Sequence, residues 1–172
     1  MESIERPDRP KPPDNGSELV QLTAWLDFYR ATLITKCSGL SMGELCLRPV
    51  ETSTLSLLGL IRHMTLVEQH WFESTFANFA APTYYQHDSD PDADFNDLAS
   101  APLDEVVANF EAACNRSREL VAGKVLDEMA ASQRRGREVD LRWIFIHMIE
   151  EYARHCGHAD MLRELIDGST GY

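Results

Sequence analysis

The chain has 172 residues, of which 44% are hydrophobic and 26% charged, and its formal net charge is −12. This length and apolar content suffice for one packed core without disulfide bonds. The negative charge argues against nucleic acid or an anionic membrane surface as a partner, because binding to either relies on lysine and arginine. No apolar run approaches the roughly 20 residues needed to cross a bilayer. The N-terminal segment lacks a basic region followed by an apolar one, so we expect no signal peptide and a cytoplasmic location.

Residues 1–16 are rich in proline and charge, which predicts a flexible arm ahead of a single domain over residues 17–172. A first helix is predicted to begin after Ser17, its N-cap, and to end near Gly39, because leucines and a tyrosine recur between them every three or four residues. The segment "SMGELCLRPVETST" that follows reads as a connection, since Pro49 interrupts any helix.

A second helix is predicted over about residues 54–79, a third over 103–122 and a fourth over 141–167, each with an apolar stripe. The segment "QRRGREVD" before the fourth helix predicts a turn or short ribbon, and Gly168 is expected to end that helix. Four amphipathic helices in a chain of this size predict an all-α fold, a four-helix bundle.

The connection over residues 81–102 is long, acidic and bounded by prolines. Antiparallel neighbours need only a short loop, so this length predicts a crossover between parallel second and third helices. Asp88, Asp90 and Asp92 fit positions 1, 3 and 5 of a calcium-binding loop. Ala93 and Ala99 nevertheless replace the glycine and glutamate that such a loop needs at positions 6 and 12, so we interpret the acidic segment as solvated.

The cysteines form no CxxC pair and no regular framework; they are Cys37, Cys46, Cys114 and Cys156. In a reducing compartment they are expected to be small apolar core residues. Cys156 adjoins the histidines of the fourth helix, and a reactive thiol is the alternative there.

A polar stripe stands out in the fourth helix, in "HMIEEYARHCGHAD". At 100° per residue its members fall within an arc of about 80°; they are His147, Glu151, His155 and His158. Apolar residues flank His155 three, four and seven positions away, which places His155 and Glu151 at or beside the buried face. An unpaired carboxylate is costly there, so a compensating group is expected.

His63 of the second helix also lies among apolar residues, and it reaches the level of His155 if the two helices are antiparallel. Imidazole nitrogen and carboxylate oxygen are ligands of Zn²⁺ and similar ions, and ligands at i and i+4 share one helix face. This pattern favours a metal site formed by His63, Glu151 and His155.

Other interpretations of these residues stay open at this point. His63 alone would fit a hydrogen-bonded core histidine, and Glu151 a partner of a buried arginine. His147 could support the site by hydrogen bonding or lie exposed near the bundle end. His158 could replace a ligand or hydrogen-bond one from outside. The remaining histidines are expected at the surface or in a loop; they are His70 and His87.

The stretches "TLSLLGLIRHMTLVEQHWF" and "HMIEEYARHCGHADMLREL" resemble the DinB superfamily, and most closely its DUF664 or mini-circle-protein branch. The likeness extends from about Ser17 to Asp167. It implies a four-helix bundle with a long crossover after the second helix. It also implies a metal site with one histidine from that helix and two ligands four residues apart on the fourth.

Aligned position by position, the resemblance assigns these three ligands to His63, Glu151 and His155. The ligand at position 151 is histidine in many members and glutamate in the branch of mycothiol-dependent maleylpyruvate isomerase-type proteins. The family's His-Arg-Gly-Gln element aligns with residues 155–158, so that His158 takes the place of the glutamine. The resemblance gives no residue a catalytic role.

Characterised members of the superfamily are metal-dependent transferases or isomerases that use thiols such as mycothiol or bacillithiol. The resemblance therefore implies a thiol S-transferase or isomerase, with a small-molecule thiol and an electrophile as substrates. Zinc is the expected ion, with nickel or another first-row ion as the alternative. Two other functions stay open: a non-catalytic metal-binding or structural bundle, which could be a homodimer, and a metal-dependent hydrolase.

Overall fold

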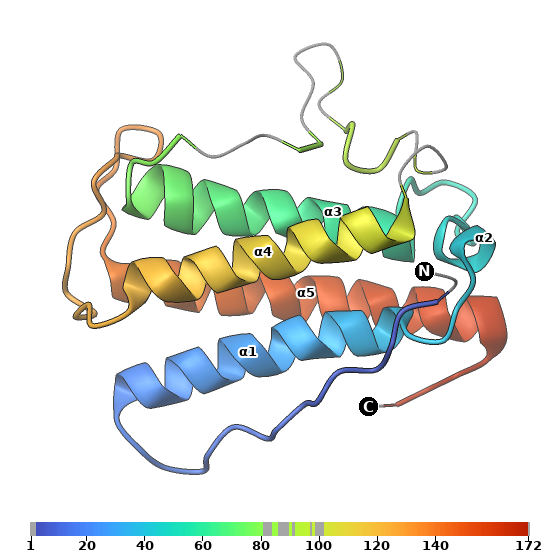
Figure 1. Cartoon of the computed structure of the whole chain (residues 1–172), viewed down its shortest axis with the longest axis horizontal. Coiled ribbons are helices and arrows are strands. Elements are labelled where there is room, and N and C mark those ends of the chain that lie inside the picture. Colours follow the sequence, from blue (N-terminus) through green and yellow to red (C-terminus); the bar gives the residue numbers. More distant parts are fainter. Residues whose placement is uncertain are drawn as a thin grey trace.

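The computed structural model describes residues 3–80, 84–85, 90, 92–96, 98 and 102–171. Within them, long helices lie side by side as a four-helix bundle (Figure 1). The helices are α1 (Glu18–Cys37), α2 (Met42–Leu45), α3 (Leu57–Glu68), α4 (Leu103–Val121) and α5 (Leu141–Asp167), and a π-helix, η1 (Gln69–Phe76), continues α3. The predicted all-α fold is confirmed.

The directions of the helices follow the predicted order. α3 and α4 run the same way in Figure 1, whereas α1 and α5 run the opposite way. The long connection between η1 and α4 therefore crosses the bundle, as its length predicted. This arrangement makes α5 antiparallel to α3, which is the condition under which His63 and His155 share a level.

Capping side chains and one glycine set the helix ends. Ser17 Oγ accepts a hydrogen bond from the Val20 amide at 3.4 Å, and Asp140 Oδ1 accepts one from the Trp143 amide at 2.8 Å. Gly168 has φ 77°, a left-handed conformation that ends α5 at little steric cost. The predicted start of the first helix and end of the fourth are therefore correct.

The second predicted helix differs from the observed one in two ways. The observed helix begins at Leu57, and Ser56 Oγ, its N-cap, accepts a hydrogen bond from the Gly59 amide at 3.1 Å. Its second half is a π-helix, in which the Ala77 amide bonds to the carbonyl of Phe72, five residues earlier. The connection before it contains the short helix α2, which a capping box between Ser41 and Glu44 stabilises.

One buried polar cluster joins all four long helices. The Glu68 carboxylate on α3 has no solvent exposure and accepts two hydrogen bonds from Arg30 of α1, at 2.8 and 2.7 Å. It also accepts one from Ser117 of α4 at 2.7 Å and one from Tyr152 of α5 at 2.8 Å. Each carboxylate oxygen therefore has two donors, which compensates for the cost of burying its charge.

The N-terminal arm has no regular secondary structure over residues 3–16 and lies along α1. Ile4 is buried, and its carbonyl accepts a hydrogen bond from the Gly39 amide at 3.0 Å. The Arg9 guanidinium lies over the ring of Phe28, 5.0 Å from its centre. The flexibility of the arm and the single-domain division stay predictions.

The four cysteines are unpaired, and three of them are buried. Burial raises the pKa of the Cys156 thiol to about 12, so this thiol stays protonated at neutral pH. Cys156 is therefore a core residue, as the interpretation of the cysteines predicted, and its reactive alternative is not supported.

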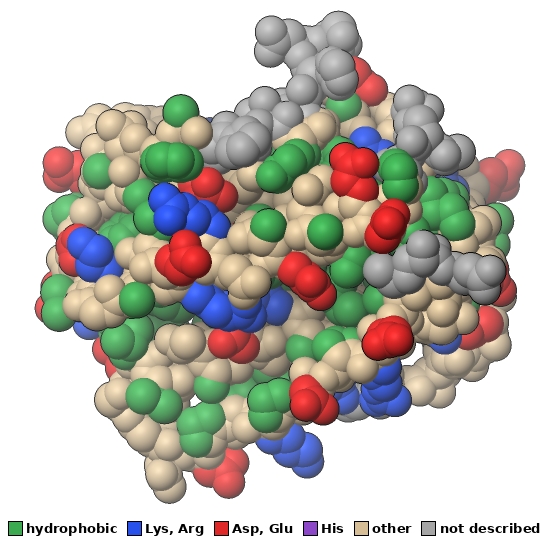
Figure 2. Space-filling model, viewed as in Figure 1, with side chains coloured by type: hydrophobic (Ala, Val, Ile, Leu, Met, Phe, Trp, Pro, Cys, Tyr) green, Lys and Arg blue, Asp and Glu red, His purple; other side chains and the backbone are tan. Residues whose placement is uncertain are grey.

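In the described part of the chain, no helix is both long enough and apolar enough to cross a membrane. Figure 2 shows carboxylates scattered over one face of the bundle, with apolar and basic side chains between them. The acidic excess of the composition is thus dispersed on this face.

Candidate metal centre

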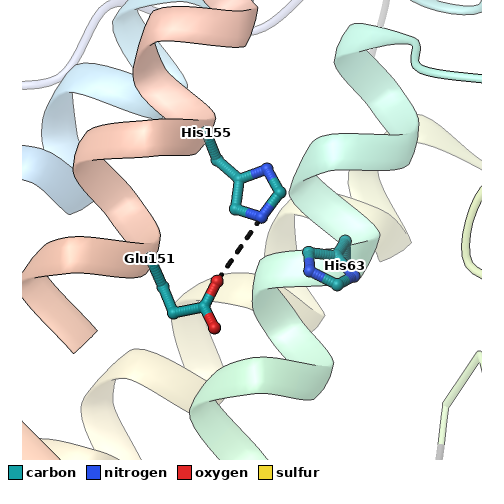
Figure 3. Close-up of side chains that lie close together, drawn as sticks. All are labelled: His63, Glu151 and His155. Carbon is teal, nitrogen blue, oxygen red and sulfur yellow. Dashed lines mark ion pairs between the residues drawn. The ribbon is translucent and has the colours of Figure 1, made fainter. Parts of the chain in front are cut away.

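Three side chains from two helices meet at one place in the bundle. Glu151 and His155 lie one turn apart on α5, and His63 faces them from α3 (Figure 3). One ligand atom from each residue lies within 4.8 Å of the other two. Glu151 Oε2 is 3.6 Å from His155 Nε2, and the two imidazole ring centres are 4.8 Å apart. The structure thus brings together the three residues that the sequence predicted as ligands.

The three side chains are neither sealed in the core nor fully exposed. Their exposed fractions are 28% for His63, 23% for Glu151 and 15% for His155. This degree of burial suits a site that binds a ligand from solution.

His63 is oriented by an aspartate that the sequence analysis did not single out. Its Nδ1 lies 2.7 Å from Oδ2 of Asp94, which is 6% exposed and comes from the crossover connection. A carboxylate accepts hydrogen bonds, so Asp94 keeps the proton of His63 on Nδ1. The lone pair of His63 Nε2 is then free to bind a metal ion. The solvated interpretation of the acidic segment is therefore wrong for Asp94. One feature of the sequence could have indicated this burial: the bulky apolar Phe95 directly follows Asp94.

Basic side chains hold the segment around Asp94 in place. Arg62 donates hydrogen bonds to the carbonyls of Ala93 at 2.9 Å and Asn96 at 3.1 Å, and Arg48 donates one to the carbonyl of Phe95. The guanidinium groups thus bind the loop through its backbone rather than through its acidic side chains.

Only part of the segment that was compared with a calcium-binding loop lies within the described residues. Asp88 and Ala99 lie outside the described residues, as does His87. Asp90 accepts hydrogen bonds from the Asp92 amide at 3.0 Å and from the Asn96 side chain at 2.9 Å. These bonds form a local turn. His70 is exposed, as predicted.

His155 is neutral at physiological pH. Burial, together with the neighbouring His63 and His158, lowers its pKa to about 4. Its Nδ1 lies 3.4 Å from Nδ1 of His158, while its Nε2 faces Glu151. The neutral imidazole is the form that binds a metal ion, and His158 lies where it can hold the ring in that orientation.

His147 lies beside Glu151 on the side away from His155. Its Nε2 is 3.2 Å from Glu151 Oε1, although the alignment is not that of a hydrogen bond. Burial lowers the pKa of His147, and its ring stacks on Trp143 with centres 4.9 Å apart. A second set of ligand atoms also lies within 4.8 Å, from His147, Glu150 and Glu151. Nδ1 of His147 faces Glu150 and Nε2 faces Glu151, so the two carboxylates lie at opposite nitrogens of the ring. This second set is therefore less suited to bind one ion than His63, Glu151 and His155.

Glu151 is not the partner of a buried arginine. Among the described residues its ion pairs are with His147 and His155, and the buried Arg30 pairs with Glu68 instead. The alternative interpretation of Glu151 is therefore wrong.

Fold and site together define a four-helix-bundle protein with a cluster of two histidines and a glutamate suited to a divalent metal. A family described as mycothiol-S-transferase matches residues 21–168. The chain therefore belongs to the mycothiol-S-transferase family, a DinB-like family, as the resemblance indicated. Members of DinB-like families typically bind a metal, and this membership suggests a mycothiol-related S-transferase function. No match was found among curated proteins or among solved structures.

Proposed function

We propose that the protein is a metal-dependent thiol S-transferase, and that His63, Glu151 and His155 hold its divalent ion. The observation that carries this proposal is the environment of Glu151. Its carboxylate is partly buried, it has no lysine or arginine partner among the described residues, and burial lowers the pKa of both adjacent histidines. A carboxylate beside two neutral imidazoles lacks a compensating positive charge, which a bound cation supplies.

The donor set suits zinc or a similar first-row ion. Two imidazole nitrogens and one carboxylate oxygen are common zinc ligands, and three protein ligands leave a coordination position for a substrate. When bound, such an ion lowers the pKa of a coordinated thiol and so favours the nucleophilic thiolate near neutral pH.

The chain's own residues have separate parts in this proposal. Asp94 keeps the proton of His63 on Nδ1, and His158 supports the ring of His155. The partial exposure of the cluster admits a thiol such as mycothiol and a small electrophile. Four unpaired cysteines and a thiol that must stay reduced both fit a cytoplasmic location.

The ligand assignment is tested by the metal content of protein purified without a histidine tag, with an excess of zinc added and then removed by gel filtration. We expect close to one ion per chain in the wild type and nearly none in His155→Ala. His70→Ala, which removes an exposed histidine outside the cluster, is the matched control and should retain the ion. Unchanged stoichiometry in His155→Ala would contradict the assignment.

The reaction class is tested separately, by following loss of an electrophile such as monochlorobimane with mycothiol present and absent. The proposal requires thiol-dependent consumption by the zinc-loaded wild type that His155→Ala does not show. Turnover without thiol would indicate hydrolysis instead, and metal binding without any turnover would indicate a non-catalytic protein.

A further inference from the structure

The loop between α4 and α5 contains a strongly basic hairpin, orange at the left of Figure 1. Arg134 and Arg137 exchange two backbone hydrogen bonds, each 2.9 Å long, around Arg135 and Gly136. Both central residues have positive φ, 48° and 75°, which is the geometry of a type I′ turn. The amides of Ala131 and Ser132 bond to carbonyls near the end of η1, so the hairpin is fixed to the bundle.

A pocket of about 270 Å³ lies at this hairpin. Its lining comprises Arg134, Arg135, Arg137, Glu138, Val139 and Trp143. We call it the arginine pocket. Three arginines and one glutamate belong to this lining, and Trp143 adds an aromatic side chain. A small anion with a planar or apolar body fits this combination of charge and surface.

The three arginines of this pocket differ from most others in the protein. Six arginines form ion pairs with carboxylates of the chain: Arg30, Arg116, Arg118, Arg142, Arg154 and Arg163. In the described part of the chain, Arg134, Arg135 and Arg137 form no ion pair, although the protein carries a net charge of −12. The Arg134 guanidinium instead lies over the ring of Trp71, 4.6 Å from its centre. Their donor groups therefore remain available to an external anion.

A continuous row of side chains connects the arginine pocket to the candidate metal centre. Trp143, His147, Glu151 and His155 follow one another at intervals of four residues on α5, so they share one helix face. The Trp143 ring stacks on His147, and His147 lies 3.2 Å from Glu151. Eight residues of helix separate Trp143 from Glu151, which corresponds to about 12 Å. One small molecule or two adjoining ones can span that distance.

We propose that the arginine pocket binds a carboxylate group of a reacting molecule whose other end reaches the candidate metal centre. This inference rests on the proposed thiol transfer and narrows its substrate class to carboxylate-bearing molecules. The planar guanidinium groups bind the carboxylate oxygens by charge-assisted hydrogen bonds, and Trp143 contacts the adjoining apolar part. The carboxylate is carried by the electrophile, because mycothiol has no free carboxylate.

Binding is measured first, without metal, thiol or turnover, by calorimetric titration of EDTA-treated protein with phthalate, an aromatic dicarboxylate. We expect saturable, salt-sensitive binding to the wild type, and binding of the neutral dimethyl phthalate at least about tenfold weaker. The double variant Arg135→Gln/Arg137→Gln should bind phthalate at least about tenfold more weakly, because it loses two charged donors.

The matched control is Arg116→Gln/Arg118→Gln, which removes the same two charges from α4, outside the pocket. It should keep its phthalate affinity within about twofold of the wild type, since only the long-range field of the protein changes. Arg135 and Arg137 are exposed and form no ion pair in the described structure, so their replacement leaves the fold intact; unfolding midpoints in urea verify this. Equal phthalate affinity in both double variants, or no binding to the wild type, would overturn the proposal.

The role of the pocket in the reaction is tested by inhibition of the mycothiol-dependent reaction with phthalate. We expect phthalate to compete with a carboxylate-bearing electrophile. Inhibition that is not competitive with the electrophile overturns the role of the pocket in the reaction. If no thiol-dependent turnover exists at all, the calorimetric result still decides whether the pocket binds carboxylates, so the two proposals fail separately.

Discussion

The bundle contains two carboxylates with opposite surroundings. Glu68 has no solvent exposure, receives four hydrogen bonds and pairs with Arg30. Glu151 is 23% exposed, and its neighbours are two histidines whose pKa values burial lowers. The first carboxylate is fully compensated by the chain, whereas the second is not.

This difference distinguishes a structural polar cluster from a candidate ligand site. Glu68 needs nothing from outside, and each of the four long helices supplies one member of its cluster. Glu151 gains from an added cation because no lysine or arginine among the described residues pairs with it. Replacing each carboxylate should therefore have different consequences for stability and for metal binding.

The largest effect is expected for Glu68→Ala. Removing this carboxylate leaves Arg30 buried without its main partner, which should lower the free energy of unfolding by about 3–5 kcal/mol. Urea denaturation measures the change. Glu119→Ala, which removes an exposed carboxylate paired with Arg116, should cost less than about 1 kcal/mol. Similar losses in both variants would contradict the distinction between buried and exposed pairs.

Glu151→Gln should give the converse result. Zinc affinity of the variant, measured by competition with a chromogenic chelator, should fall at least about 100-fold because an anionic ligand becomes a neutral amide. The unfolding free energy of the metal-free protein should change by less than about 1 kcal/mol, since no cation loses its partner. A loss of stability in metal-free Glu151→Gln comparable to that of Glu68→Ala would remove the contrast between the two clusters.

Asp94→Asn changes a residue that contacts the proposed ligand His63 without being a proposed ligand itself. The amide is a weaker acceptor for the Nδ1 proton of His63, and we expect zinc affinity to fall about 10–100-fold. Asp92→Asn is the matched control, since Asp92 is an exposed aspartate of the same loop. Equal affinities in the two variants would show that Asp94 does not orient His63.

A further prediction concerns the pH dependence of the metal-free protein. His155 has a pKa of about 4 in the folded chain, below the value near 6.5 of an unfolded histidine. Between these values the unfolded state binds a proton that the folded state does not, so this residue lowers stability as pH falls from about 6.5 to 4. Urea midpoints over that range should decline less in His155→Gln than in the wild type; parallel curves would show that the pKa is not lowered.

The bundle and most of the candidate site could be predicted because their signals are local. Apolar residues three and four apart mark a helix face, and Glu151 and His155 are one turn apart whatever the rest of the chain does. His63 required one non-local assumption, an antiparallel neighbour, which the length of the 81–102 connection supported.

Asp94 and Glu68 could not be predicted in the same way. Both are charged residues whose burial depends on partners distant in the chain: His63 for the first, and Arg30, Ser117 and Tyr152 for the second. The change from α3 to η1 also has no local marker, because α- and π-helical turns tolerate the same residues.

Gly59 lies under the loop that carries Asp94. A Cβ atom at this position would come within 2.5 Å of the Phe95 ring and 2.9 Å of Ser56 Oγ, so a side chain there must displace the ring next to Asp94. The packing of the residue next to Asp94 therefore depends on the absence of a single methyl group one helical turn before His63. Gly59→Ala would disturb the proposed site with every proposed ligand intact. A small residue at position 59 thus belongs to the sequence requirements of the proposed site, as the proposed ligands do.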